Sequence, residues 1–443
     1  MSTNLYTDVV ELCSELIRFD TSNFGAGESR GERDAAEYVA EKLAEVGHDP
    51  TVLESAPGRA STVVRIAGED PSAPALLVHG HLDVVPAARA DWSFDPFSGE
   101  VRDGAVWGRG ALDMKDMDAM MLAVARAFSR EGTRPPRDVV MAFVADEEDT
   151  GELGAGFLVR EHPDLFEGVT TAIGESGGYT VHLPDGSRLY PVATGERGSA
   201  WMTLTARGRA GHGSRPHDAN AVASLAAAVH RLAEHRWPVQ PGPTVDALVD
   251  GLCAHLDVKV DLEDPASLDQ LGEAASLVAP IIRNTISPTM LAAGYKHNVI
   301  PSEATAGIDG RILPGQTDFF FEVVDELIGP DVTREFASFA EPVSVSHETP
   351  AFAAMAAALR AHDPDALVLP FSMAGGTDAK LFSRLGIDCY GFAPGTTPPG
   401  FDAGAYVHGV DERVLIDSLK FGVRVLQDFL LAPVQAGSDR TGA

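Results

Sequence analysis

One apolar segment of the 443-residue chain ends abruptly at a run of acidic residues. Residues 139–145 are rich in valine, phenylalanine and methionine, and they are followed by Asp146, Glu147 and Glu148. A continuous apolar run of this length is typical of a buried parallel strand in an α/β protein. Three adjacent carboxylates repel one another, which raises their pKa values and costs stability unless a cation lies nearby. Because open α/β sheets bind ligands at the carboxyl ends of their strands, we predict a metal site beyond this strand.

Two further predicted strands also lead to residues that can bind a metal. The apolar run 74–78 precedes His81 and Asp83, and the run 169–173 precedes Glu175. In an extended segment His81 and Asp83 point to the same side, and a carboxylate is a common partner of a zinc-bound histidine. The alternative for His81 is a hydrogen-bonded core histidine, because short motifs recur by chance. Because three predicted strands each lead to a histidine or an acidic residue, we favour the metal site over a core histidine.

Two other candidate ligands lie in loops next to predicted helices. Asp113 precedes a helix with apolar residues at helical spacing, so it is either a capping residue or a carboxylate that bridges two metals. His408 lies shortly before Asp411, which we predict to be the N-cap of an amphipathic helix over residues 412–431.

The sequence pattern changes twice along the chain, which predicts one domain inserted into another. Residues 1–198 and 348–443 have the pattern of a parallel α/β domain, whereas residues 199–347 have that of an α+β unit. We therefore expect a two-domain α/β fold. Its catalytic domain has a mixed, mostly parallel sheet with helices on both faces, and the α+β domain interrupts it. This interruption explains how His408 can join ligands near residue 81.

The candidate ligands comprise two imidazoles and three carboxylates: His81, Asp113, Glu148, Glu175 and His408. Nitrogen and oxygen ligands without thiolate suit zinc, with cobalt or manganese as alternatives. Five ligands exceed the needs of one tetrahedral zinc with an open position, so we predict two Zn²⁺ per chain, about 3.5–4 Å apart. One acid must stay free to accept a proton from water, and the Glu147–Glu148 pair offers one residue for each task.

The motifs around these residues resemble those of the M20 metallopeptidases, which include acetylornithine deacetylase, succinyl-diaminopimelate desuccinylase, aminoacylase-1 and glutamate carboxypeptidase. They follow in family order: HLDVVP (81–86), GRGALDMK (108–115), DEE (146–148), ESGG (175–178), GHGSRP (211–216), NVIP (298–301), GGTD (375–378) and HGVDE (408–412). The resemblance implies that His81, Asp113 and Glu175 bind one zinc. His408, Asp113 and Glu148 would bind the other, with Asp113 as the bridge.

The resemblance also implies roles for other residues. Asp83 would orient His81, and Glu147 would be the general base and acid. His212 is similar to the family's lid histidine, which reaches the other subunit's active site in dimers and stabilises the oxyanion. The inserted domain would therefore be a lid and dimerisation domain. The substrate's carboxylate would be held by residues that include an arginine, whose planar fork pairs bidentately with carboxylates: Arg311, Asn298, Gly376 and Thr377.

Two features depart from the family pattern. Asp116 stands where members of the family usually have glycine, and a fourth acid close to Asp113 can alter metal affinity. Residues 237–280 are longer than in the compact members, as in the larger subgroup that includes the N-acyl amino acid hydrolases. The acyl group and the amino acid are therefore not predicted.

Net charge, the N-terminal segment and the cysteine content indicate the kinds of partner and location that the chain has. The formal net charge of −31 argues against nucleic acid, whose phosphate backbone requires a basic surface. The N-terminal segment is amphipathic and carries acids, so we predict neither a signal peptide nor a membrane span. Three widely spaced cysteines are typical of reduced thiols and favour the cytoplasm.

We predict a dizinc amidohydrolase that cleaves a small N-acyl amino acid or dipeptide with a free carboxylate, of the deacylase type. The alternative is an exopeptidase of the dipeptidase or carboxypeptidase type, because the scissile bond is an amide in both cases. The remaining alternative is a catalytically dead M20-like binding protein, which a missing ligand or base would indicate. A homodimer through the inserted domain follows from the role of His212 alone.

Overall fold

The computed structural model describes residues 2–433, which form two compact units. Within the described residues, the first unit comprises residues 2–194, 345–370 and 377–433, and the second comprises residues 195–344 and 371–376. Residues 434–443, which end the predicted catalytic domain, lie outside the described part. The chain thus leaves the first unit and later returns to it. The catalytic and lid roles of the two units stay predictions.

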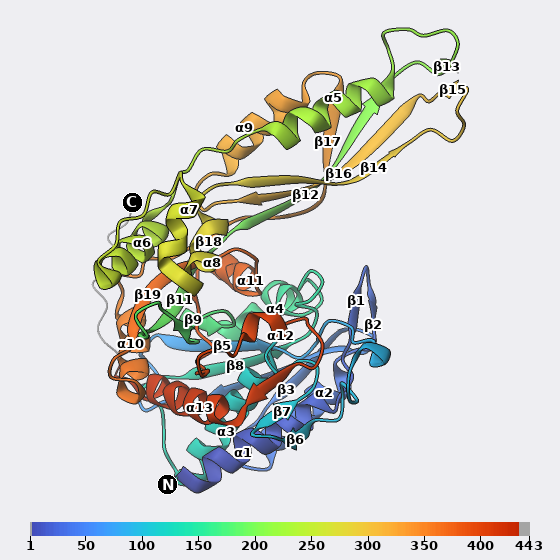
Figure 1. Ribbon diagram of the computed structural model, residues 1–443. Coiled ribbons are helices and arrows are strands. Elements are labelled where there is room, and N and C mark those ends of the chain that lie inside the picture. Colours follow the sequence, from blue (N-terminus) through green and yellow to red (C-terminus); the bar gives the residue numbers. More distant parts are fainter. Residues whose placement is uncertain (1, 434–443) are drawn as a thin grey trace. The chain divides into compact units, whose positions relative to one another are not determined.

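The first unit is built on a large mixed sheet (Figure 1) with the strand order β10-β11-β20-β9-β5-β8-β4-β3. The central strands β8, β5, β9 and β20 are parallel, and the strands on either side pair antiparallel. Strand β19 pairs with β11, and so does β18, which belongs with residues 195–196 of β11 to the second unit. The bounds are β3 (Thr51–Ala56), β4 (Arg59–Ile66), β5 (Ala75–His81), β8 (Val139–Val144), β9 (Val169–Gly174), β10 (Val181–His182), β11 (Arg188–Glu196), β18 (Val343–Ser344), β19 (Leu367–Met373) and β20 (Asp388–Gly391).

Helices cover both faces of this sheet. Alternate residues of β5 point to opposite sides, so Val78 packs into one core cluster and Leu77 into another. The first cluster contains side chains of α1 (Ser2–Ile17), α2 (Arg33–Ala44), α3 (Lys115–Glu131), α10 (Pro350–His362) and α13 (Ile416–Leu430). The second contains side chains of α4 (Ala155–Glu161) and α11 (Ala379–Phe382). The predicted α/β fold with a mixed sheet and helices on both faces is confirmed. The prediction of a mostly parallel sheet is wrong, because the strand pairs outside the four central strands are antiparallel.

Two small sheets complete the strands of the first unit. One is the hairpin of β1 (Asn23–Gly25) and β2 (Glu28–Ser29), and the other joins β6 (Glu100–Arg102), β7 (Ala105–Trp107) and β21 (Arg413–Leu415). The prediction of one helix over residues 412–431 is wrong at its start, because residues 413–415 pair with β7 and α13 begins at Ile416. Pairing with β7 satisfies the backbone there, and Asp411 is not a helix cap.

The second unit contains a four-stranded antiparallel sheet with the order β14-β16-β12-β17. Side chains of its strands and of two helices form one core cluster. In that cluster Trp237 stacks on Phe320, with ring centroids 4.9 Å apart. The bounds are β12 (Gly198–Arg207), β14 (Thr285–Ala293), β16 (Glu303–Ile312), β17 (Val332–Ala340), α5 (Ala221–Glu234) and α9 (Thr317–Ile328).

Short elements account for most of the rest of the described chain. In the second unit, β13 (Gly211–His212) pairs with β15 (Val299–Ile300), and the predicted insertion contains α6 (Pro243–Leu256), α7 (Pro265–Leu268) and α8 (Ala275–Val278). In the first unit, α12 (Ala403–Tyr406) precedes His408. Short 3₁₀ segments span Arg89–Asp91, Pro163–Phe166, Asp269–Ala274, Ala279–Ile281 and Ser383–Leu385, and the third of them is kinked at Gly272. Among residues 2–433, no helix has both the length and the apolar composition needed to cross a bilayer.

Candidate metal centre

Three neighbouring parallel strands bring side chains to one edge of the main sheet. Strand β5 ends at His81, β8 is followed by the acids 146–148, and β9 is followed by Glu175. In the sheet register His81 lies beside Val144, so the ends of β5 and β8 meet at the same level. Open α/β sheets bind ligands at this carboxyl edge.

The small sheet of β6, β7 and β21 brings two loop residues to the same place. Strands β7 and β21 pair antiparallel, with Trp107 opposite Arg413. Asp113 lies in the loop after β7, and His408 lies in the loop before β21. This pairing places two residues that are far apart in the sequence within contact distance.

The five predicted ligands form two groups that share Asp113. In the first group, His81 Nε2 lies 3.1 Å from Asp113 Oδ1 and 3.3 Å from Glu175 Oε2. In the second group, His408 Nε2 lies 3.0 Å from Asp113 Oδ2 and 3.2 Å from Glu148 Oε2. The ligand atoms of each group lie within 4.8 Å of one another. Asp113 thus offers one carboxylate oxygen to each group, as a carboxylate that bridges two cations does.

The chemistry of these donors fits divalent cations. Both groups combine imidazole nitrogen with carboxylate oxygen and contain no thiolate, which is a donor set for zinc, cobalt or manganese. Although burial alone would raise the pKa of Asp113, hydrogen bonds from His408 and His81 hold it well below its ordinary value. Hydrogen bonds to Asp113 and Glu148 raise the pKa of His408 to about 10. Both pKa shifts arise because several carboxylates lie close together in the two groups, and two cations would neutralise their negative charge.

The candidate ligand His81 is oriented by the backbone of Asp83 rather than by its carboxylate. His81 Nδ1 lies 2.9 Å from the Asp83 carbonyl oxygen and 3.8 Å from Asp83 Oδ1. Donation from Nδ1 to this carbonyl leaves Nε2 unprotonated and able to bind a cation. The Asp83 carboxylate instead accepts hydrogen bonds from the backbone N–H groups of Glu147 and Glu148, each at 3.1 Å, and from Asn23 Nδ2 at 2.9 Å.

The three acids after β8 have different environments. Asp146 has a left-handed backbone with φ 73°, and its carboxylate lies 2.8 Å from Arg59 Nη2 and accepts the Leu153 N–H. Glu148 belongs to the His408 group. Glu147 Oε2 lies 3.9 Å from His81 Nε2, outside both groups, and burial together with Glu175 raises its pKa. The geometry therefore gives the three neighbours separate positions around the centre.

Comparison with known proteins agrees with this arrangement. A model of peptidase family M20/M25/M40 matches residues 77–432. The chain belongs to this family. It is therefore a hydrolase that acts on amide or peptide bonds.

Three relatives of this M20 protein match it over most of their length. The N-fatty-acyl-amino acid synthase/hydrolase PM20D1 of Xenopus tropicalis is 29% identical over 94% of this chain and 84% of its own. The probable carboxypeptidase S-like 2 of Dictyostelium discoideum is 30% identical over 81% of this chain and 72% of its own. Aminoacylase-1 of Mus musculus is 27% identical over 90% of this chain and 89% of its own.

Solved structures share the fold of the M20 protein. The M20 family metallo-carboxypeptidase Sso-CP2 from Sulfolobus solfataricus matches with a TM-score of 0.70 at 20% identity, over 97% of this chain and 99% of that chain. The YXEP protein of Bacillus subtilis, titled a dinuclear metal binding peptidase from the M20 family, matches with a TM-score of 0.60 at 13% identity, over 96% of this chain and 98% of that chain.

The remaining predicted site residues lie mostly in the second unit. His212 is exposed on β13, where its Nδ1 accepts the Ser214 N–H at 3.2 Å. The guanidinium of Arg311 is engaged by both carboxylate oxygens of Asp309, at 2.9 and 3.1 Å. Asn298 is exposed, and its carbonyl accepts the Gly213 N–H. Gly376 ends the second unit, and Thr377 is buried in the first. Their roles toward a substrate stay predictions.

Arg109 and Glu412 lie in the motifs GRGALDMK and HGVDE, but the sequence alone indicated no role for them. Both are buried, and Arg109 Nη1 lies 2.5 Å from Glu412 Oε2. Their place in two separate motifs was the available signal, but only the fold shows that they meet. Asp116, the acid that departs from the family pattern, belongs to neither ligand group, and its Oδ1 accepts the Met117 N–H at 2.8 Å.

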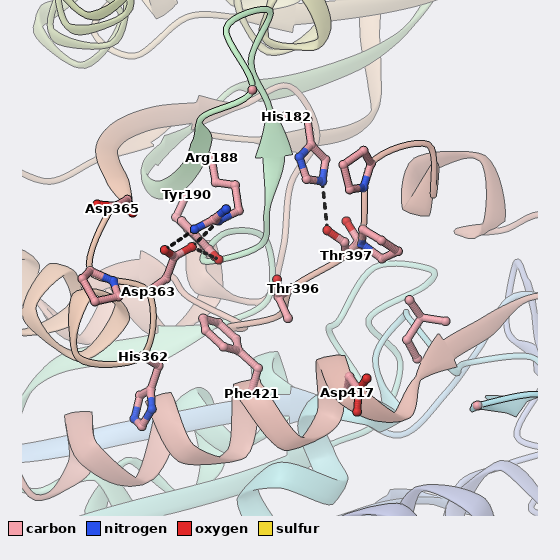
Figure 2. Close-up of a pocket in the computed structure, with 16 residues that line it drawn as sticks. His182, Arg188, Tyr190, His362, Asp363, Asp365, Thr396, Thr397, Asp417 and Phe421 are labelled. Carbon is pink, nitrogen blue, oxygen red and sulfur yellow. Dashed lines mark hydrogen bonds and ion pairs between the residues drawn. The ribbon is translucent and has the colours of Figure 1, made fainter.

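A pocket of about 640 Å³ lies elsewhere in the first unit (Figure 2), and none of its lining residues is a predicted site residue. Its polar side chains contact one another. The Arg188 guanidinium engages both oxygens of Asp363, and Tyr190 donates to the same carboxylate at 2.9 Å. His182 Nε2 lies 2.9 Å from the Thr397 carbonyl oxygen. These contacts join the β10–β11 hairpin to the end of α10 and to the loop after β20.

Proposed function

We propose that this M20 hydrolase is a dizinc amidohydrolase that cleaves the amide bond of a small N-acyl amino acid with a free carboxylate. The observation that carries the proposal is the pair of ligand groups that share Asp113. Five nitrogen and oxygen donors suit two zinc ions, with cobalt or manganese as alternatives.

Glu147 would move the proton during hydrolysis. Bound cations would polarise the scissile carbonyl and activate a water, which is the chemistry that metals supply in two-metal hydrolases. The Glu147 carboxylate lies 3.9 Å from His81 Nε2 and outside both ligand groups, so it is free to accept the proton of that water. It would then deliver the proton to the leaving amine. Asp83 would support this position, because its carboxylate holds the backbone of Glu147 and Glu148.

The names of two relatives support an N-acyl amino acid as substrate. PM20D1 is named an N-fatty-acyl-amino acid synthase/hydrolase, and the other relative is named an aminoacylase. In the proposal, Arg311 binds the substrate's carboxylate in place of Asp309 with the help of Asn298, Gly376 and Thr377. Asp309 already accepts two hydrogen bonds from the Arg311 guanidinium. A substrate carboxylate can accept the same two bonds without any change in the guanidinium geometry. His212 would stabilise the oxyanion.

We also propose that two copies of the chain form a homodimer through their second units. Strand β14 is at the edge of its sheet, and its Met290 and Leu291 side chains are 72% and 66% exposed. An exposed apolar edge strand is a template for pairing with a second copy. Leu291→Lys should convert the dimer to a monomer in light scattering, whereas Thr203→Lys on the central strand β12 should leave it dimeric. A monomeric parent protein would contradict the dimer. The cytoplasmic location is tested separately by cell fractionation.

The decisive test is identification of the products. The purified chain, loaded with Zn²⁺, Co²⁺ or Mn²⁺, is mixed with N-acyl amino acids of increasing acyl length and with dipeptides, and products are identified by mass spectrometry. We expect one carboxylic acid and one amino acid from an acyl series. A chelator should abolish their release and added metal should restore it. Products from dipeptides alone would refute the deacylase. A chain that binds two cations but cleaves no compound of the panel would keep the metal centre and refute the proposed substrate class.

An exopeptidase of the carboxypeptidase or dipeptidase type is the second candidate. It is favoured by the Dictyostelium discoideum relative, which is 30% identical and named as a probable carboxypeptidase. Dipeptides with free and acetylated N-termini distinguish the two exopeptidase types, because a dipeptidase requires the free amine and a carboxypeptidase does not. Cleavage only of the free form would establish a dipeptidase.

A further inference from the structure

We propose that Arg109 and Glu412 form a buried clamp that holds His408 against Asp113 and thereby sets the affinity of one cation site. This inference rests on the proposed dinuclear centre. The site concerned is the one formed by Asp113, Glu148 and His408. Arg109 and Glu412 would touch neither cation nor substrate, so both are positioning residues.

Glu412 joins the clamp to the loop that carries Asp113. Its Oε1 accepts the Leu112 N–H at 2.7 Å, directly before Asp113, and its Oε2 accepts the Gly110 N–H at 3.1 Å. Its backbone carbonyl accepts the Gly108 N–H at 2.9 Å, which continues the β7–β21 ladder. The side chain is fully buried, so water does not compete for these hydrogen bonds.

Arg109 joins the clamp to the loop that carries His408. Its Nη1 pairs with Glu412 Oε2 at 2.5 Å, and its Nη2 donates to the carbonyl oxygens of His408 at 3.2 Å and Gly409 at 3.0 Å. The guanidinium also lies over the Trp92 ring, 5.2 Å from its centroid. A planar fork can make these contacts together, which the single ammonium of lysine cannot.

His408 depends on such support more than the ligands of the other site. Its side chain is 51% exposed, whereas that of His81 is 1% exposed and stands at the end of the central strand β5. His408 and Asp411 also have left-handed backbones, with φ 59° and 56°. This conformation is uncommon for residues other than glycine and persists where surrounding contacts impose it. The Arg109 contacts to the His408 and Gly409 carbonyls are such contacts.

The clamp therefore acts on the two cation sites unequally. Loss of the Arg109 fork would release the backbone of His408 but leave the Glu412 hydrogen bonds to Gly110 and Leu112. His81, Glu175 and Asp113 would keep their positions, because two of them are fixed by the main sheet. We expect the His408 site to weaken while the His81 site persists.

The test compares Arg109→Lys with Arg126→Lys in the full chain. Arg126 is also buried and also contacts a carboxylate and a carbonyl, those of Glu45 and Lys42, but it lies on α3 away from the ligands. Zinc and cobalt binding are titrated by calorimetry against the metal-free protein. Arg109→Lys should bind one cation with parental affinity and the second about 10–100-fold more weakly, the usual effect of losing a residue that supports a ligand. Arg126→Lys should bind both as the parent does.

Hydrogen exchange of the metal-free proteins provides a second readout. Residues 405–412 should exchange faster in Arg109→Lys than in the parent or in Arg126→Lys. If Arg109→Lys does not fold, Arg109→Gln replaces it. Its single side-chain amide cannot donate to Glu412 and to both the His408 and Gly409 carbonyls as the guanidinium does, so the same cation site should weaken at least as much.

Three results would overturn the clamp. The first is a clamp variant that binds two cations with parental affinity, and the second is equal weakening of both sites. The third is the same loss in Arg126→Lys. A parent chain that binds fewer than two cations would refute the dinuclear centre of the proposed function, and the clamp with it. The number of cations bound by the parent thus distinguishes the two failures.

Discussion

Glu147 and Glu148 are adjacent, identical residues with different contacts, and the proposed mechanism gives them different tasks. Glu148 Oε2 lies 3.2 Å from His408 Nε2 within a ligand group, whereas Glu147 lies outside both groups. Glutamine keeps the size of either side chain and removes its charge. Glu147→Gln should therefore keep both cations, whereas Glu148→Gln should lose the cation next to His408.

The expected loss of rate follows from the role of Glu147 as proton acceptor. A positioned general base contributes about 10²–10⁴-fold, so Glu147→Gln should lower kcat by that factor, or roughly 3–5 kcal/mol in activation free energy. Glu148→Gln should also lower the rate, but an excess of zinc should restore part of it by mass action. Zinc should restore nothing in Glu147→Gln.

The assay combines metal analysis of the purified variants with kcat at increasing zinc concentration. Each variant serves as the matched control for the other, because the substitution and the chain segment are the same. Equal metal loss in both variants would refute the distinction between base and ligand. Full activity of Glu147→Gln would refute its role in proton transfer.

Three further substitutions test the contacts around the centre. Asp113→Asn removes the shared carboxylate, so dialysis should show both cations bound at least ~10-fold more weakly, and loss of only one would contradict a bridge. Arg59→Met removes the ion-pair partner of the buried Glu32 and Asp146 side chains and should lower the free energy of unfolding, measured in urea, by about 3–5 kcal/mol; an unchanged value would contradict this expectation. Asp363→Asn should cost roughly 1–2 kcal/mol near neutral pH. Because Arg188 holds the pKa of Asp363 below its ordinary value, the parent loses this contribution as pH falls through that pKa, and the two unfolding curves should converge below about pH 4.

The sequence by itself determined the α/β fold class and the residues that converge at the carboxyl edge of the sheet. Runs such as residues 139–145 are apolar because a central parallel strand is buried on both faces, and the change to acids marks where the strand leaves the core. Strand ends identified in this way need no knowledge of distant partners. For that reason His81, Glu148 and Glu175 were predictable one segment at a time.

Only the tertiary structure decided which polar groups meet. Residues 413–415 were predicted to be helical because their local spacing allows it, and pairing with β7 made them a strand. Asp83 was predicted to orient His81 through its carboxylate, yet its carbonyl is the closer group, since only three-dimensional distances separate two acceptors on one residue. The contact between Arg109 and Glu412 was equally invisible, because it joins segments that are distant in the chain. Hydrogen bonds are short-ranged and directional, so their partners follow from the fold and not from local sequence pattern.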